Sequence, residues 1–368
     1  MSVTLFLSGD VMTGRGIDQV MATPAQPTLY ESWVKSATEY VHLAEARNGP
    51  IPRRVEPEYI WGDALEVLDT AGVDASIINL ETSVTSHDDP WPGKGIHYRM
   101  HPDNIACITV AGIDCCVLAN NHVLDWSHPG LTETLETLRQ AGMMTAGAGS
   151  DEEEAKRPAT IETGPPGRVA VVALGHPSSG IPTSWSAGPD RPGVALLSAL
   201  SNDEVELITG SVASAAGPRA VIVASIHWGS NWGYRIPESH RRFAHALIDR
   251  AGVDVVHGHS SHHPLGIEIY QDRPILYGCG DLINDYEGIS GHESYHPDLG
   301  ILYLVTTDEE GGLEEMELVP MRMRRFRLEH PPVDEVAWME ETLRKQSEPL
   351  GAEVSSEGQG RILVRSLR

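Results

Sequence analysis

Five strand-like segments of this sequence end in residues that bind metal ions, and this pattern restricts the fold more than any other feature. The segments are short and apolar, and they begin near residues 3, 75, 113, 220 and 253. They end, in chain order, at Gly9-Asp10, Asn79-Leu-Glu81, Asn120-Asn-His122, His227 and the run HGHSSHH at 257–263. In open α/β sheets, ligands bind at the carboxyl ends of the strands. The sequence therefore predicts that these five ends meet at one centre.

Helical patterns separate the strand-like segments. Residues 29–46, 59–71, 129–140 and 237–251 have helical periodicity, and the last three each have a glycine within two residues of their end. Strands that alternate with helices predict layered α/β architecture. We expect residues 1–327 to form the main domain, with hairpins near 267–277 and 299–318. Residues 328–368 are more charged, and we expect a peripheral tail with one helix near 333–345.

The charge balance restricts the partners. The chain has 368 residues, with 52 Asp and Glu against 27 Lys and Arg, and a formal net charge of −25. Such a field repels nucleic acids and anionic membranes, so neither is an expected partner. The N-terminus reads as a first core strand rather than a signal peptide, and no apolar run has the length of a membrane span. We expect a cytoplasmic protein whose four cysteines are buried free thiols.

The residues at the strand ends fit a site for two divalent metal ions. Such a site requires carboxylates, neutral nitrogen or oxygen ligands, and a separate proton donor. The candidate ligands are two carboxylates, one amide and three imidazoles: Asp10, Glu81, Asn121, His227, His259 and His262. A mixed nitrogen and oxygen set suits Mn, Zn, Fe or Co better than Ca. We expect two such ions as cofactors.

Other residues are candidates for supporting roles. His122 is left outside the ligand set as a proton donor, and Asp125 follows three residues later, where a turn would let it accept from the ring. Arg15, Lys94 and Arg99 are candidate anion clamps for the substrate. Alternatively, Arg15 pairs with a carboxylate of the site, and Lys94 and Arg99 are solvated loop charges. His257 and Asp281 are candidates for orienting a metal ligand, although His257 alternatively has a purely structural role and points into a helix layer.

Each of these residue types also has an ordinary structural role. Asp10 could cap a turn, Glu81 could be an acid at a helix start, and Asn120 and Asn121 could form a left-handed turn. His227 could be a hydrogen-bonded core histidine. This alternative is weakest for the imidazoles of the 257–263 run, because crowded histidines are costly without a metal or a compensating charge. A nucleophilic triad is the rival chemistry, but no G-x-S-x-G motif and no phosphate-binding glycine loop is present.

Taken in order, these motifs resemble those of a known family. The matching segments are Gly9-Asp10 with Arg15, Asn79-Leu-Glu81-Thr, Leu118-Ala-Asn-Asn-His122 with Asp125, Gly147-Ala-Gly149, Ile226-His-Trp-Gly229 and Gly258-His with His262. They resemble the CapA, or poly-γ-glutamate capsule biosynthesis, family, which looks like a branch of the calcineurin-like metallophosphoesterases. The resemblance covers residues 3 to about 327. It implies a four-layer αββα sandwich with a two-metal site.

The resemblance also implies a role for each matching residue. Asp10 and His262 would hold one ion, and Glu81 would bridge the two. Asn121, His227 and His259 would hold the second ion, and His122 would be the acid. The sequence departs from the family at three points: Ser260-Ser261 replace His-Pro, Gly280-Asp281-Leu282 replaces Gly-Asn-Phe, and Met12 stands where metallophosphoesterases usually have a histidine.

The expected function is metal-dependent hydrolysis of a small anionic substrate, phosphorylated or glutamyl in type. Phosphoester cleavage comes first, because a paired-metal centre suits in-line displacement. Cleavage of an amide or γ-glutamyl peptide is the alternative within enzymes. A non-catalytic part in poly-γ-glutamate or capsule assembly is a second class, and we expect it less because capsule-machinery members usually carry a membrane anchor, which we do not find. A metal-storage module is a third.

Overall fold

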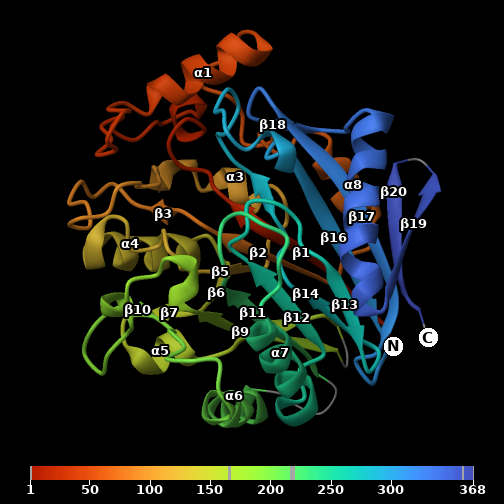
Figure 1. The fold of residues 1–368 in the computed structure, drawn as a ribbon. Coiled ribbons are helices and arrows are strands. Elements are labelled where there is room, and N and C mark those ends of the chain that lie inside the picture. The colour runs from red at the N-terminus through yellow and green to blue at the C-terminus, as the bar shows by residue number, and fades with distance from the viewer. Residues whose placement is uncertain (1, 165–166, 216–219, 359, 368) are drawn as a thin grey trace.

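Two β-sheets face each other, and helices cover their outer faces (Figure 1). The computed structural model describes residues 2–164, 167–215, 220–358 and 360–367. Within these ranges one sheet has ten strands and the other six, and we call them the larger and the smaller sheet. The α/β sandwich expected from the sequence is confirmed.

The larger sheet contains the N-terminal strand and both C-terminal strands. Its order is β19 (Ala352–Gly358), β20 (Arg361–Ser366), β17 (Leu313–Arg324), β16 (Leu299–Thr307), β1 (Val3–Val11), β2 (Ala75–Leu80), β5 (Cys115–Val117) and β6 (Met144–Ala146). Two short strands join it from the side, β15 (Asp281–Ile283) on β1 and β18 (Arg327–Glu329) on β17.

The smaller sheet is built from the middle of the chain. Its order is β13 (Ile267–Tyr270), β14 (Arg273–Leu276), β12 (Val255–His259), β11 (Ala220–His227), β9 (Arg168–Gly175) and β8 (Ala159–Glu162). Two further pairs lie outside both sheets: β7 (Ala148–Gly149) with β10 (Gly193–Val194), and β3 (Ser83–Val84) with β4 (Arg99–Met100).

Alternating side chains divide the core into three apolar layers. Along β1, Leu5 and Leu7 pack with Val171 and Val223 between the sheets, whereas Phe6 points to the other face. That outer face of the larger sheet is covered by helices α1 (Thr38–Asn48), α2 (Ala64–Thr70), α3 (Ala106–Thr109) and α4 (Ser127–Gln140). The outer face of the smaller sheet is covered by α6 (Asn202–Ala215) and α7 (Glu238–Ala251). The short helix α5 (Glu152–Lys156) packs beside β7. The order is therefore helix, sheet, sheet, helix.

One predicted helix is much shorter than expected. The periodicity predicted a helix over residues 29–46, but α1 begins only at Thr38. The preceding residues form a loop because Glu31 turns inward to the buried Arg15, at 3.0 Å, and to the hydroxyl of Tyr40. A buried ion pair therefore overrides the local helical pattern.

The C-terminal region contains more than the one expected helix. Helix α8 (Val333–Ser347) is present, and β19 and β20 follow it. β20 pairs with β17, so the end of the chain extends the larger sheet, beside α8 in Figure 1. β18 spans the boundary placed at residue 327. The division into a domain and a tail stays a prediction.

Parallel pairing brings the polar strand ends to one edge. β1, β2 and β5 are mutually parallel, as are β9, β11 and β12. A backbone contact fixes the end of β1: a Cβ on Gly9 would lie 1.7 Å from the carbonyl oxygen of Gly280.

The four cysteines are free and buried, as expected. Among the described residues, every helix is too short or too polar to cross a membrane.

Candidate metal centre

The larger sheet presents a group of buried carboxylates. Asp10 on β1 lies in register with Asp281 on the parallel strand β15, and Glu81 follows the end of β2. All three are at most 2 % exposed. Asn79 Nδ2 donates to Asp10 Oδ1 at 2.8 Å. Burial and the Asp281 charge raise the pKa of Asp10 to about 7, and burial with the nearby Asp10 raises that of Glu81.

The smaller sheet presents imidazoles at the same edge. His227 on β11 lies in register with His259 on β12, and their Nδ1 atoms are 2.8 Å apart. His227 Nε2 lies 3.0 Å from Asn121 Oδ1, and Ser225 Oγ lies 2.9 Å from His259 Nε2. Both rings are fully buried, and burial lowers the pKa of each well below its ordinary value. Both histidines are therefore neutral near pH 7, which is the form that binds a metal ion.

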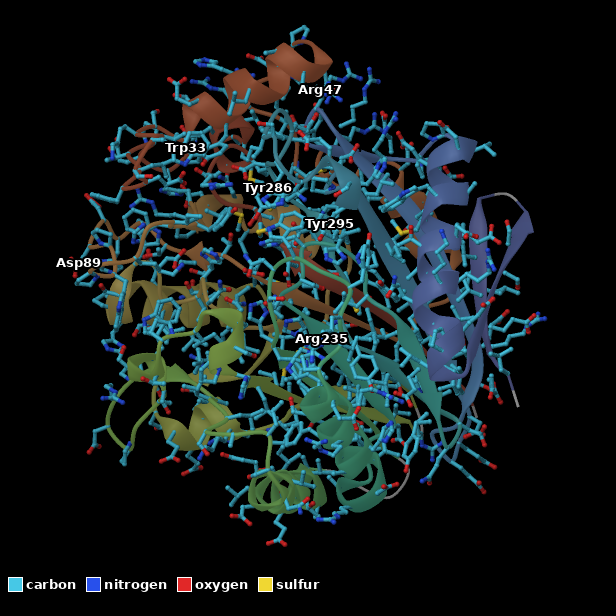
Figure 2. The ribbon with its side chains drawn as sticks, viewed as in Figure 1. Trp33, Arg47, Asp89, Arg235, Tyr286 and Tyr295 are labelled. Carbon is cyan, nitrogen blue, oxygen red and sulfur yellow. The ribbon has the colours of Figure 1, made fainter. Side chains whose placement is uncertain are left out.

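His262 lies between the two groups. Its Nδ1 is 2.9 Å from Asp281 Oδ1. Its Nε2 is 2.9 Å from Asn231 Nδ2 and 3.4 Å from the hydroxyl of Tyr286, a residue labelled in Figure 2. Burial alone would lower the pKa of His262, but the Asp281 carboxylate raises it.

These side chains fit divalent cations. Two groups of residues could each hold a metal ion, and within each group the potential ligand atoms lie within 4.8 Å of one another. Both groups contain Asp10: one with His227 and His259, the other with His262 and Asp281. Asp10 Oδ2 and Glu81 Oε2 are buried and have no hydrogen-bond partner among the residues that the structure describes. Buried carboxylate oxygens are costly unless a cation or donor satisfies them. The arrangement can therefore hold metal ions, with the acids neutralising charge and the imidazoles supplying nitrogen.

A histidine outside the ligand set stands next to the carboxylates. His122 Nε2 lies 3.7 Å from Glu81 Oε1, and its Nδ1 lies 2.6 Å from Asp125 Oδ2. Lys94 Nζ lies 2.7 Å from Asp125 Oδ1 and 3.1 Å from His122 Nδ1. Burial alone would raise the pKa of Asp125, but His122 and Lys94 lower it. Burial lowers the pKa of His122 to about 4.

The three basic residues expected to bind substrate have other partners in the structure. Lys94 pairs with Asp125, as above. Arg15 is buried against Asp285 and Glu31, with its guanidinium 3.9 Å from the centre of the Tyr40 ring. Arg99 lies over the Trp126 ring at 3.8 Å and donates to two backbone carbonyl groups. The structure brings Lys94 to the centre, whereas Arg15 and Arg99 brace the surrounding loops. Their contact with substrate stays a prediction.

His257 ties the two sheets together. The strand β12 continues to His259, so His257 and His259 share a face, which points toward the larger sheet. His257 Nε2 lies 2.8 Å from the carbonyl oxygen of Ser8, and its Nδ1 lies 3.1 Å from Ser225 Oγ. The alternative that His257 points into a helix layer is therefore wrong. Ser225 Oγ also contacts the His259 ring, so Ser225 links His257 to His259.

Sequence reasoning missed two residues of the centre. Asn231 follows β11 and Tyr286 follows β15, and both contact His262 Nε2. Neither occupies a strand end, so the pattern that revealed the other ligands passes over them. The closeness of Asn231 to the His227-Trp-Gly229 segment was the available signal.

Comparisons with known proteins identify the family. The family model of bacterial capsule synthesis protein PGA_cap matches residues 4–286. The chain belongs to this family. A protein of Mycobacterium tuberculosis, named a probable polyglutamine synthesis accessory protein, is 45 % identical over 354 residues, which cover 96 % of this chain and 93 % of that protein. The capsule biosynthesis protein CapA of Bacillus anthracis is 26 % identical over 194 residues, 52 % of this chain and 45 % of CapA. The PGA biosynthesis protein CapA of Bacillus subtilis is 26 % identical over 209 residues, 56 % of this chain and 52 % of that protein.

Proposed function

We propose that this chain is a hydrolase that uses two divalent metal ions, with a phosphoester as its substrate. The observation that carries the proposal is the convergence of two potential ligand groups on Asp10, with His122 beside them and outside both groups. A storage site needs ligands only, whereas a hydrolytic site also needs a group that moves a proton. We place one ion with Asp10, His262 and Glu81, and the second with Glu81, Asn121, His227 and His259. Asp10 also lies within reach of the second ion, because both groups of potential ligands share it.

Bound metal ions would polarise the substrate and lower the pKa of a bound water. The side chains of the protein do the rest. We assign the proton transfer to His122 Nε2, because Nδ1 is engaged with Asp125 at 2.6 Å and Nε2 faces the carboxylates. With a pKa of about 4 the ring is neutral at pH 7, and the charge of a bound anionic substrate would raise that pKa toward the working range. Lys94 holds Asp125 in place.

The names of the relatives support a second candidate. A 45 % identical protein is named a polyglutamine synthesis accessory protein, and two more distant ones are named for capsule or PGA biosynthesis. The chain would then act in the assembly of a capsule or glutamyl polymer, either by cleaving a γ-glutamyl amide at this centre or without catalysis. Among the metals, Mn, Zn, Fe and Co all suit the mixed ligand set.

One experiment separates these candidates. The purified protein is stripped with a chelator, reloaded with Mn²⁺, Zn²⁺, Co²⁺ or Fe²⁺, and assayed with an aryl phosphate and with a γ-glutamyl anilide. We expect about two ions per chain and phosphate release. His122→Ala is expected to lower the rate by about 10²–10⁴-fold with unchanged metal content, and His42→Ala, at an exposed histidine on α1, is the matched control.

Each other outcome has a defined meaning. Cleavage of the anilide alone would replace phosphoester chemistry with amide chemistry. Two bound ions without hydrolysis of either compound would favour the non-catalytic role. Absence of stoichiometric metal in every reloaded sample would refute the proposed centre.

A further inference from the structure

The metal position at His262 has an additional protein group beside it. Asn231 Nδ2 lies 2.9 Å from His262 Nε2, and nothing in the family resemblance assigns a role to this residue. Asn231 belongs to the loop between β11 and α7, and it is exposed overall although its side chain reaches a buried ring.

The tautomer of His262 identifies the nitrogen that would bind a metal. Nδ1 lies 2.9 Å from a carboxylate oxygen of Asp281, so Nδ1 carries the proton and donates it. This is the usual arrangement of a metal-binding histidine, whose second nitrogen donates to a carboxylate. With a metal ion bound, Nε2 would supply the lone pair, and Asn231 lies against that atom.

The loop backbone holds Asn231 in this place. The amide N–H of His262 donates to the carbonyl oxygen of Asn231 at 2.9 Å, so the two residues are joined through their main chains as well. On either side, the amide of Gly229 donates to Ser178 Oγ at 2.9 Å, and that of Gly233 donates to His263 Nε2 at 3.0 Å. Backbone hydrogen bonds hold the loop at three points within five residues, and they restrain the position of the Asn231 side chain beside His262.

The spacing matches that of two ligands on one ion. Ligand atoms about 2.1 Å from a metal ion and at right angles lie about 3.0 Å apart. The pair His227 Nε2 and Asn121 Oδ1, which we propose as ligands of the other ion, has this separation, 3.0 Å. The His262–Asn231 pair, at 2.9 Å, has it too. A half-turn of the terminal torsion exchanges Nδ2 and Oδ1 of an asparagine, and this brings the carbonyl oxygen to the same place.

Two other side chains lie near the His262 position and compete with Asn231 as candidate ligands. Met12 is buried near this position, with its sulfur 3.9 Å from the Tyr286 hydroxyl, and a thioether is a poor partner for Mn²⁺ or Zn²⁺. Tyr286 itself lies farther from His262 Nε2, at 3.4 Å. The amide oxygen of Asn231 is the better neutral ligand.

We propose that Asn231 is a ligand of the metal ion held by Asp10 and His262, and so pairs with Asn121 at the other ion. Each ion then has one amide oxygen from a loop. This inference rests on the proposed two-metal function, and it adds a ligand that comes from the smaller sheet.

The test compares metal binding by four forms of the full chain: wild type, Asn231→Ala, Asn231→Asp and Ser230→Ala. Ser230 is the exposed neighbour in the same loop, and its hydroxyl donates to the Trp232 carbonyl. Co²⁺ is titrated into chelator-treated protein, with bound metal measured by elemental analysis and coordination followed by the visible absorption of Co²⁺. We expect Asn231→Ala to lower the affinity for one of the two Co²⁺ ions by at least about 10-fold and to change the absorption spectrum of that ion. Asn231→Asp is expected to bind both ions as the wild type does, and Ser230→Ala is expected to have no effect.

The outcomes separate this inference from the proposed function. If the wild type binds two ions and Asn231→Ala binds both with unchanged affinity and spectrum, Asn231 is not a ligand and the two-metal centre stands. If Ser230→Ala weakens binding as much as Asn231→Ala, the loop acts through its fold and the ligand assignment is refuted. If the wild type binds no Co²⁺, both proposals fail.

Discussion

The larger sheet supplies acids and an amide to the centre, whereas the smaller sheet supplies imidazoles. Asp10, Glu81 and Asp281 come from strands of the larger sheet, and His227 and His259 are in register on two strands of the smaller one. Burial acts on the two groups in opposite directions: it raises the pKa of Asp10 and Glu81 and lowers that of both histidines.

This difference shows why the centre needs both sheets. Carboxylates alone repel one another in the buried interior, and neutral imidazoles alone cannot balance the charge of a divalent ion. A cation between the sheets neutralises the carboxylates of the larger sheet and is bound by the lone pairs of the imidazoles of the smaller sheet. Metal binding is therefore expected to join the two sheets, and substitutions on either side have different consequences.

The largest effect is expected from Asp10→Asn, because both potential ligand groups share Asp10. The substitution keeps the contact with Asn79 Nδ2 and removes one negative charge. We expect both ions to bind at least about 100-fold more weakly, since metal affinity depends on the charge of the ligand set. Isothermal titration with Mn²⁺ measures this. Asp74→Asn, at the opposite end of the same sheet, is the control; loss of one ion only would show that Asp10 is not shared.

His259→Ala tests the other sheet and is expected to have a narrower effect. His259 belongs to only one of the two groups, so we expect one ion to be lost while the ion near His262 remains. Elemental analysis after dialysis against Zn²⁺ is the measurement, with His42→Ala as the control. Loss of both ions would mean that binding at the His262 position requires the ion at His259, so the two positions would not bind independently.

Much of this centre could be predicted from the sequence, because strand ends are encoded locally. The strand 75–80 was predicted with its observed bounds, and parallel strands bring their ends together by topology. The partners of long side chains could not be predicted. Arg15 meets Asp285 across 270 positions of the chain, and Asn231 reaches His262 from a loop. Such contacts depend on tertiary packing, which leaves no periodic signal. The strands β19 and β20 were missed for the same reason, since charged and polar residues interrupt their pattern.

The pH dependence of stability tests the acidic half by itself. The pKa of Asp10 is raised from 3.8 to about 7, so between these values the folded protein binds more protons than the unfolded chain. Stability in a chelator is therefore expected to fall as the pH rises from 5 to 8, with the Asp10 contribution on the order of 2 kcal/mol. Asp10→Asn removes this contribution. Urea unfolding of both proteins at pH 5, 6, 7 and 8 measures it, and parallel curves would contradict it.

The smallest effect is expected at the contact between the sheets, through His257→Leu. Leucine cannot bond to the Ser8 carbonyl oxygen, which His257 Nε2 reaches at 2.8 Å, and we expect a loss of about 1 kcal/mol in the free energy of unfolding. Ser225 Oγ also loses one of its two imidazole contacts and holds the His259 ring less firmly. The ion at His259 is therefore expected to bind about 10-fold more weakly, while the ion at His262 is unaffected. His245→Leu, on α7, is the control for removing a bonded imidazole elsewhere. Equal weakening of both ions would show that His257 sets the distance between the sheets, whereas weakening of one ion would show that it orients a single ring.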